Sequence, residues 1–224
     1  MEIGRVFNDF ICITHFIKVK LEIQTTYQTL SQQSEGLYKE KGSKFIAYAV
    51  PCYSEEEAKR FLEKWRKEHY QSRHVCWAYR FGLDKKQFRA NDDGEPSNSA
   101  GAPILGQIQS FDLTNVLIGV VRYFGGVKLG VGGLIHAYRE AAQDALKQAE
   151  IIEIEVFHHV QIQFTYELMP EIMNWLKKMN LDYSNQQFEL DCKIDVKIPL
   201  NNSLKLKTEL NDLGELNIKE LGEW

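Results

Sequence analysis

The sequence has no long apolar run of the kind that crosses a membrane. A membrane helix needs about 18 uninterrupted apolar residues, whereas the most apolar stretch near the start of the chain, residues 10–17, is short and contains His15. Glu2 and Asp9 precede it where a signal peptide carries basic residues. We therefore expect no membrane contact, no export signal and a cytoplasmic protein.

Paired cysteines are also missing. Cys12, Cys52, Cys76 and Cys192 are scattered along the chain, and none forms the C-x-x-C pair of a zinc knuckle or a redox site. Apolar residues (44%) and charged residues (26%) occur in the proportions of a globular protein, which excludes a disordered chain and a disulfide-stapled miniprotein. We expect the thiols to be reduced and buried.

A strong net charge is absent too, but the charges are unevenly distributed. Residues 1–150 carry 20 Lys and Arg against 18 Asp and Glu, net +2, while residues 151–224 carry 7 against 13, net −6. Only two of the 15 glycines follow residue 134. These shifts predict a boundary near residue 150. We expect an N-terminal domain over residues 25–150, a C-terminal domain over residues 151–224, and an unassigned extension over residues 1–24.

Hydrophobic patterning indicates an α+β fold. In the first half it predicts helices over residues 54–69 and from about Leu134 to Ala149, and strands over residues 44–50, 75–81 and 115–124. The last of these strands is continuously apolar, which is typical of a central strand. Ser54 begins a predicted capping box, in which its side-chain oxygen accepts from the Glu57 amide and the Glu57 carboxylate accepts from the Ser54 amide.

The second half alternates strands and helices in the order βαββαβ, which predicts a small ferredoxin-like domain. The expected helices cover residues 170–179 and 199–213, and the expected strands cover residues 156–164, 181–188, 190–198 and 216–221. This pattern is common and says nothing about chemistry.

Nine of the glycines fall between Gly94 and Gly133. The sequence R-Y-F-G-G-V-K-L-G-V-G-G-L, residues 122–134, joins a strand to a helix, so bare amides, a helix dipole and Lys128 come together where an anion could bind. The spacing is not that of a P-loop, because Val131 stands where lysine is required. The alternative is that these glycines only allow a tight, closely packed crossing from the strand to the helix.

A second motif, N-D-D-G-E-P-S, begins at Asn91 and holds three carboxylates within four residues, those of Asp92, Asp93 and Glu95. A tight turn, a docking site for Arg or Lys from elsewhere in the domain, and a cation site are all compatible with it. The EF-hand spacing is absent. We expect no dedicated metal site and no cofactor.

A catalytic nucleophile is not evident. His74 and Cys76 share a strand face, but nothing nearby supplies a site that would stabilise a thiolate. Ser97 and Ser99 lack a G-x-S-x-G elbow. We therefore expect no catalytic residue.

Several motifs together resemble the IMPACT family, in particular its bacterial YigZ-type members. They are S-K-F at residue 43, H-V-C-W-A-Y-R at residue 74, D-D-G-E-P-S at residue 92, A-G-x-P-I at residue 100 and the glycine-rich segment just described. The resemblance implies an N-terminal left-handed βαβ domain like domain four of elongation factor G, followed by a ferredoxin-like domain like its domain five. It also implies association with RNA or the ribosome, and regulation of translation.

Our leading hypothesis is a non-enzymatic, translation-associated protein that binds RNA phosphates through its N-terminal domain. The expected basic face consists of Lys41, Lys44, Arg73, Arg80, Arg122, Lys128 and Arg139. The family motifs add a surface made of His74, Trp77, Asp92, Asp93, Gly94, Glu95, Pro96, Tyr123, Gly125, Gly126, Gly130, Gly132 and Gly133. Trp77, Tyr79, Tyr123 and Phe124 are candidates for base stacking, although core packing is the simpler role for most of them.

Two alternatives stay open. The first is a protein-interaction module that presents the acidic turn and the glycine loop to a protein partner. The second is a metal-assisted hydrolase that uses Asp92, Asp93 and Glu95 with His74 as base. The sequence pI near 5.9 weighs against RNA binding unless the basic side chains cluster in one place.

Overall fold

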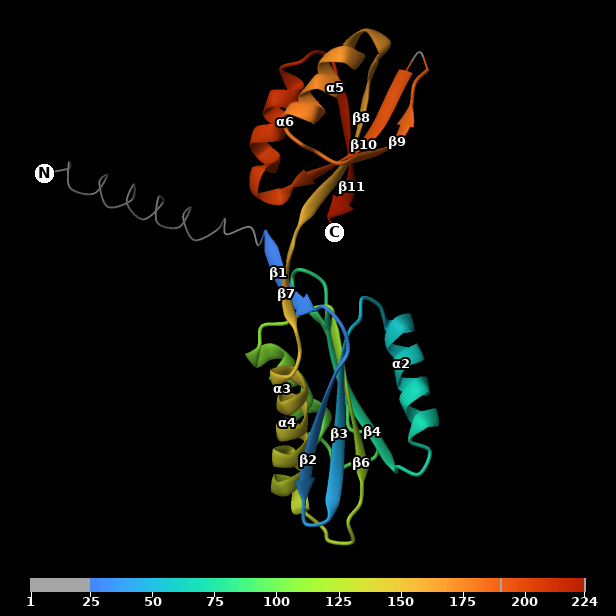
Figure 1. Ribbon diagram of the computed structural model, residues 1–224, viewed down its shortest axis with the longest axis vertical. Helices are drawn as coiled ribbons and strands as arrows, with labels where there is room; N and C mark the ends of the chain where they lie inside the picture. Colours follow the sequence, from blue (N-terminus) through green and yellow to red (C-terminus); the bar gives the residue numbers. More distant parts are fainter. Residues whose placement is uncertain (1–24, 190, 224) are drawn as a thin grey trace, which may run out of the picture. The chain divides into compact units, whose positions relative to one another are not determined.

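A computed structural model describes residues 25–189 and 191–223 (Figure 1). The predicted extension over residues 1–24 and Cys12 lie outside the described residues. The described chain forms two compact units, one over residues 27–154 and the other made mainly of residues 155–223. None of the described helices is both long and apolar enough to cross a membrane.

The N-terminal unit is built on a five-stranded sheet in the order β2-β3-β6-β4-β5, and each neighbouring pair is antiparallel. The strands are β2 (Ser34–Glu40), β3 (Ser43–Pro51), β4 (His74–Phe81), β5 (Gln87–Asn91) and β6 (Val116–Tyr123). The apolar run was predicted to be a central strand, and β6 is indeed the middle strand and almost wholly buried. Since β3 and β4 both pair with β6, they run parallel to each other and form a βαβ unit with the helix between them.

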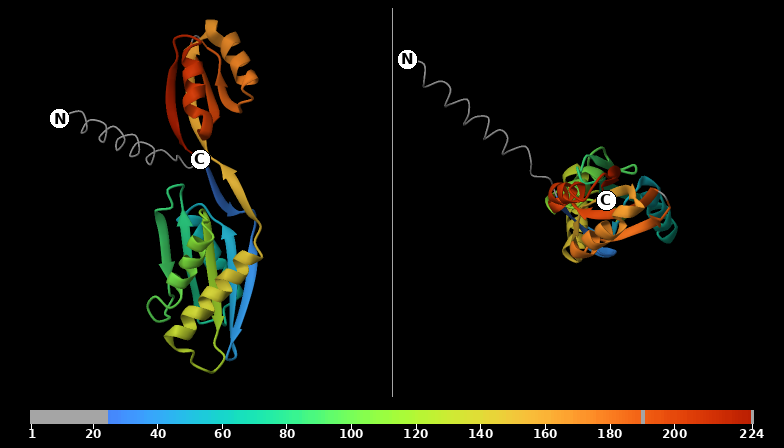
Figure 2. Two further views of the ribbon diagram at one scale, coloured as in Figure 1. Left: turned by 90° about the vertical axis from the view of Figure 1, so that its left-hand side faces the viewer. Right: turned by 90° about the horizontal axis from the view of Figure 1, so that it is seen from above.

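Helices cover both faces of this sheet (Figures 1 and 2). Helix α2 (Glu55–Glu68) packs on one face through Ala58 and Trp65, whereas α3 (Gly101–Ser110) and α4 (Gly130–Lys147) pack on the other. The sheet is therefore the middle layer between two hydrophobic cores.

Two details of the helices differ from the prediction. Ser54 Oγ accepts from the Glu57 amide at 3.2 Å as expected, but the Glu57 carboxylate accepts from the amide of Tyr53 at 2.9 Å, one residue before the cap. Helix α4 begins at Gly130, four residues earlier than the apolar face indicated. Because glycine is a poor helix former, helix propensity predicted that residues 130–133 belong to the preceding loop.

A two-stranded sheet joins the ends of the unit. Strand β1 (Thr26–Leu30) pairs with β7 (Ile151–Glu155), and the Ser31 amide donates to the Glu150 carbonyl at 3.0 Å. The Thr29 hydroxyl also donates to the carbonyl of Asn115, at the start of β6.

The C-terminal unit is a four-stranded antiparallel sheet in the order β11-β8-β10-β9, with both helices on one face. Its elements are β8 (Phe157–Thr165), α5 (Met169–Lys178), β9 (Tyr183–Gln187), β10 (Asp191–Pro199), α6 (Ser203–Asn211) and β11 (Asn217–Glu223). The predicted ferredoxin-like βαββαβ domain is confirmed. Helix α6 starts later than predicted, because residues 200–202 form a 3-10 turn.

The contact between β2 and α4 depends on a glycine. A Cβ atom added to Gly36 would lie 2.2 Å from the backbone nitrogen of Ala145, which a side chain cannot accommodate. We therefore expect Gly36→Ala to lower the free energy of unfolding by about 2 kcal/mol or more, since overpacking forces the backbone to shift.

Gly106→Ala is the matched control. Gly106 lies within α3 and an added Cβ would meet no atom within 4 Å, so alanine should stabilise the helix by about 0.5 to 1 kcal/mol. Urea unfolding of the full chain measures both variants. If Gly36→Ala leaves the midpoint unchanged or raises it, the close packing of β2 on α4 is not what Gly36 provides.

Candidate functional site

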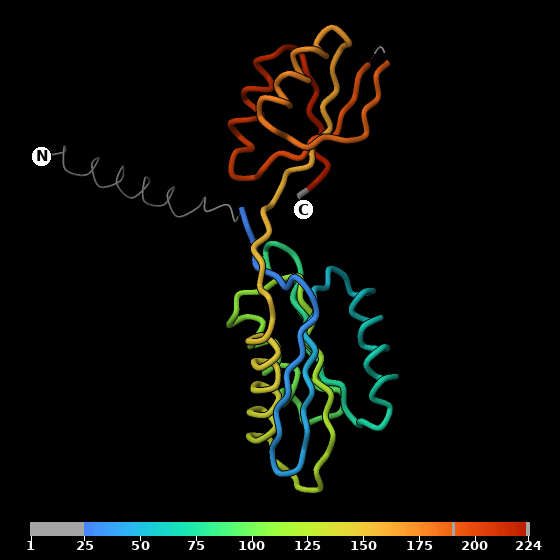
Figure 3. The backbone as a smooth tube through the Cα atoms, in the orientation of Figure 1, coloured from blue at the N-terminus to red at the C-terminus, as the bar shows by residue number. Residues whose placement is uncertain are grey.

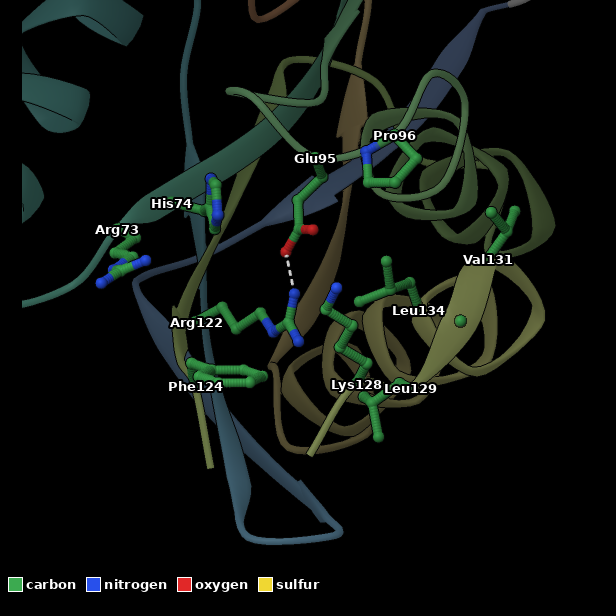
Figure 4. Close-up of a pocket in the computed structure, with 11 residues that line it drawn as sticks. Arg73, His74, Glu95, Pro96, Arg122, Phe124, Lys128, Leu129, Val131 and Leu134 are labelled. Carbon is green, nitrogen blue, oxygen red and sulfur yellow. Dashed lines mark hydrogen bonds and ion pairs between the residues drawn. The ribbon is translucent and has the colours of Figure 1, made fainter. Parts of the chain in front are cut away.

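A pocket of about 450 Å³ lies where β4 begins, β6 ends and α4 begins (Figure 4). It is on the sheet face that carries α3 and α4. The pocket is lined by Arg73, His74, Glu95, Pro96, Arg122, Phe124, Lys128, Leu129, Gly130, Val131 and Leu134. Both motifs of the sequence, the acidic turn and the glycine-rich segment, thus contribute to one site.

The turn between β2 and β3 fixes the course of the glycine-rich segment. A Cβ atom on Gly125 would lie 1.9 Å from the carbonyl carbon of Gly42, so the two backbones touch, and Figure 3 shows the two turns together at one end of the unit. The chain then enters α4 through Gly130, whose φ of +74° favours glycine. Leu129, at the cap position, offers no side-chain hydrogen bond, so no side chain caps the first turn of α4 beside the pocket.

The acidic turn is held by its own carboxylates. Asp92 accepts from the amides of Asn98, Ala100 and Gly101 at 2.8 to 2.9 Å. Asp93 accepts from the Val75 amide at 2.7 Å and pairs with Arg66 at 2.8 Å. These carboxylates therefore have structural partners.

Glu95, in contrast, faces the pocket, where it meets Arg122. The Arg122 Nη1 atom lies 2.6 Å from Glu95 Oε1, and both side chains are more than 90% buried. The Tyr138 hydroxyl of α4 donates to the same oxygen at 2.8 Å, and the Cys76 sulfur lies 3.3 Å from that hydroxyl. One network thus links the acidic turn, β4, β6 and α4.

Two aromatic rings lie against the Arg122 guanidinium. The Phe45 and Phe124 ring centres lie 5.5 and 5.6 Å from its carbon. Its Nε atom is buried without a hydrogen-bond partner among the described residues. Figure 4 shows the side chain pointing into the pocket toward Lys128, while Arg73 lies at the rim beside His74.

His74 and Cys76 do not form a nucleophile and base. His74 Nδ1 lies 2.7 Å from the carbonyl oxygen of Asp93, which can only accept, so Nδ1 carries the proton. Cys76 donates to the Asp92 carbonyl at 3.0 Å, and burial raises the pKa of its thiol. Cys76 is therefore a neutral structural donor.

The structure separates the seven basic residues predicted to form one face. Arg73, Arg122 and Lys128 line the pocket, and Lys41 is exposed in the turn that contacts Gly125. Lys44 points to the opposite sheet face, where it lines a second pocket. Arg139 is exposed on α4 but does not line the pocket.

Arg80 lies at the other end of the sheet. It is six residues along β4 from His74, or about 20 Å, and it is 7% exposed. Its Nε donates to the Leu113 carbonyl at 2.5 Å and its Nη2 lies 3.4 Å from Asp112. Arg80 is thus a structural residue that the expected basic face does not contain.

Of the residues predicted from the family motifs, some line the pocket and others lie elsewhere in the unit. Trp77 and Tyr123 point to the α2 face, where Trp77 stacks on Tyr79 and the Tyr123 hydroxyl bonds to His69. Gly94 has a φ of +86°, and a Cβ atom added to it would lie 3.6 Å from the His74 ring. An added Cβ atom would meet nothing within 4 Å at Gly126 or Gly132, whereas at Gly133 it would approach Leu129.

Comparisons with known proteins match this architecture. The Impact N-terminal domain model matches residues 41–146. The IMPACT family member YvyE of Bacillus subtilis is 32% identical over 87% of this chain and 91% of its own length. The chain belongs to the IMPACT family. YigZ of Escherichia coli, also an IMPACT family member, is 30% identical over 81% of this chain and 90% of its own length. A crystal structure of a hypothetical protein superposes with a TM-score of 0.70 at 27% identity, covering 89% of this chain and 99% of that one.

Several pocket residues of this IMPACT family member were not among the predicted site residues. Leu129, Val131 and Leu134 form apolar walls, and Phe124, which is 52% exposed, covers one face of Arg122. Phe124 had been considered only as a stacking candidate. Apolar residues set between glycines, such as Val131 between Gly130 and Gly132, were the sequence signal that could have located these walls.

The ion pair between Glu95 and Arg122 should behave as a buried unit. Arg122→Met removes the cation and leaves the Glu95 carboxylate buried, so we expect the free energy of unfolding to fall by about 3 to 5 kcal/mol. The double variant Arg122→Met, Glu95→Gln removes both charges and should lose less than Arg122→Met alone. Urea unfolding of the full chain measures the difference. Additive losses in the double variant would contradict the pairing.

The thiols of the described residues should be unreactive. Cys52, Cys76 and Cys192 are buried, and burial raises the pKa of Cys52 to about 12. In a Cys12→Ser variant at pH 8, we expect Ellman's reagent to label less than one thiol until urea unfolds the protein. Rapid labelling of Cys76 in the folded protein would contradict its assignment as a buried donor.

Proposed function

We propose that this IMPACT family protein is a non-enzymatic, translation-associated binding protein whose N-terminal unit contacts RNA phosphates through the pocket. The observation that carries the proposal is the convergence of Arg73, Arg122 and Lys128 beside the uncapped start of α4. Cationic side chains and the amides of a helix N-terminus are the groups that bind phosphate in proteins.

Clustering, and not net charge, provides the attraction. Residues 27–154 carry 17 Lys and Arg against 16 Asp and Glu, a net charge of only +1. Yet within the described chain no carboxylate lies within 4.0 Å of Arg73 or Lys128, whereas the acidic turn is engaged with its own partners. The Arg73 and Lys128 side chains are therefore available to a ligand.

The C-terminal unit is less suited to RNA. Along most of β8 and β10 the outward sheet face carries polar residues, namely His159, Gln161, Gln163, Lys193, Asp195 and Lys197, with Phe157 and Pro199 at one end. Ferredoxin-like domains that bind single-stranded RNA stack bases on aromatic side chains at such a face. We therefore assign RNA contact to the N-terminal unit.

The two alternative functions have weaker support. A protein partner docking on the acidic turn would need exposed carboxylates, but the Asp93 and Glu95 side chains are 20% and 4% exposed. A hydrolase would need converging metal ligands, but Asp92, Asp93 and Glu95 engage separate partners. Among the described residues, no group of three or more His, Cys, Asp or Glu is arranged to hold a metal ion.

Filter binding of single-stranded RNA over a range of salt concentrations tests the proposal. We expect affinity to fall steeply with salt, because phosphate binding releases counterions. Arg73→Ala, Lys128→Ala removes two exposed cations and should reduce the slope of log affinity against log salt by about 1 to 2. Arg122 is left intact because it stabilises the fold.

The control variant is Lys59→Ala, Arg60→Ala, which removes two exposed cations from α2, on the other side of the sheet. It matches the charge change of the pocket variant and should leave the salt slope almost unchanged. Absence of RNA binding, binding that does not depend on salt, or equal effects of the two double variants would overturn the proposal.

A further inference from the structure

We propose that the pocket holds one nucleotide bearing a phosphate monoester, as found at the end of an RNA strand. This inference rests on the proposed RNA binding and makes it more specific, since most phosphates in RNA are internal diesters. Four features of the pocket support it: its charge, the state of Arg122, the open backbone at the start of α4 and the apolar walls.

The charge of the pocket matches a dianion. The lining residues include three cations, Arg73, Arg122 and Lys128, against one carboxylate, that of Glu95, which leaves two positive charges. The N-terminus of α4 adds roughly half a charge. An internal diester carries one negative charge, whereas a monoester carries about 1.5 to 2 near pH 7. A monoester is therefore the better electrostatic match.

Arg122 is prepared for a second acceptor. A guanidinium has five N–H donors, and Glu95 engages Nη1, while Nε is buried without a partner in the described chain. Nε has almost no accessible surface, so the donors that an acceptor in the pocket can reach are those of Nη2, which has no hydrogen-bond partner among the described residues. The guanidinium lies against the Phe45 and Phe124 rings, which restrict its orientation, and the side chain points into the pocket (Figure 4).

The backbone at the start of α4 permits close approach. Gly130 lines the pocket, and a Cβ added to it would meet no atom within 4 Å, so the space beside the first turn is open. A phosphate can approach the amides there without meeting a side chain.

The walls suit a nucleoside attached to that phosphate. Pro96, Phe124, Leu129 and Val131 are apolar, and Phe124 and Val131 are about half exposed. One face of the Phe124 ring lies against Arg122, and its exposed surface offers a platform for a base. A volume of about 450 Å³ is within the range of small-molecule pockets, roughly 300 to 1,000 Å³.

Binding of the full chain to short RNAs of one sequence tests the inference. The probes carry a 5′-phosphate, a 3′-phosphate or hydroxyls at both ends, and a nucleoside monophosphate is a fourth ligand. We expect at least one phosphorylated RNA to bind about tenfold tighter than the hydroxyl-ended RNA. Arg73→Ala, Lys128→Ala should abolish this preference, and Lys59→Ala, Arg60→Ala should retain it.

Phe124→Leu tests the base platform separately. Leucine keeps an apolar cover on Arg122 but removes the ring, so binding of the preferred RNA should weaken about tenfold. An unchanged affinity would overturn the assignment of Phe124. Thermal unfolding of the variant, monitored in parallel, shows whether the fold is retained.

The outcomes separate the inference from the proposed function. Equal affinity for all three RNAs overturns the monoester site and leaves RNA binding intact. If no RNA binds, the proposed function fails. Binding of the nucleoside monophosphate then tests whether the pocket is a phosphate monoester site. Binding of the monophosphate that Arg73→Ala, Lys128→Ala abolishes supports a site for free nucleotides, whereas absence of binding overturns the inference as well.

Discussion

The buried pair between Glu95 and Arg122 is the interaction on which the pocket depends. Glu95 comes from the acidic turn and Arg122 from the central strand, and Tyr138 of α4 donates to the same carboxylate. One oxygen therefore connects three parts of the chain that are far apart in sequence. Such a pair is costly to bury unless its hydrogen bonds are satisfied, and here the geometry that satisfies Glu95 also orients Arg122.

Glycine has two different roles in this unit. At Gly36, Gly119 and Gly125, an added Cβ atom would collide with Ala145, Trp65 and Gly42, so these glycines allow layers to pack closely. At Gly126, Gly130 and Gly132 the space is open. The glycine-rich segment thus contains both kinds: close packing accounts for Gly125, whereas Gly126 and Gly130 have positive φ and border open space.

Much of the fold could be predicted because hydrophobic periodicity reports which elements form. The central strand, α2 and the ferredoxin-like order follow from it. The site could be predicted only in part. Arg80 and Arg122 both lie in buried strands, and sequence alone does not show that Arg80 meets Asp112 at one end of the sheet while Arg122 reaches the pocket at the other. Strand register and partner positions decide this, and both are set by tertiary pairing.

The pairing of β1 with β7 brings the entry and exit of residues 27–154 to one place. That place adjoins the start of β6, whereas the pocket lies at the end of the same strand, roughly 20 Å away. The chain that flanks this segment on either side therefore attaches at the end of the unit opposite the pocket.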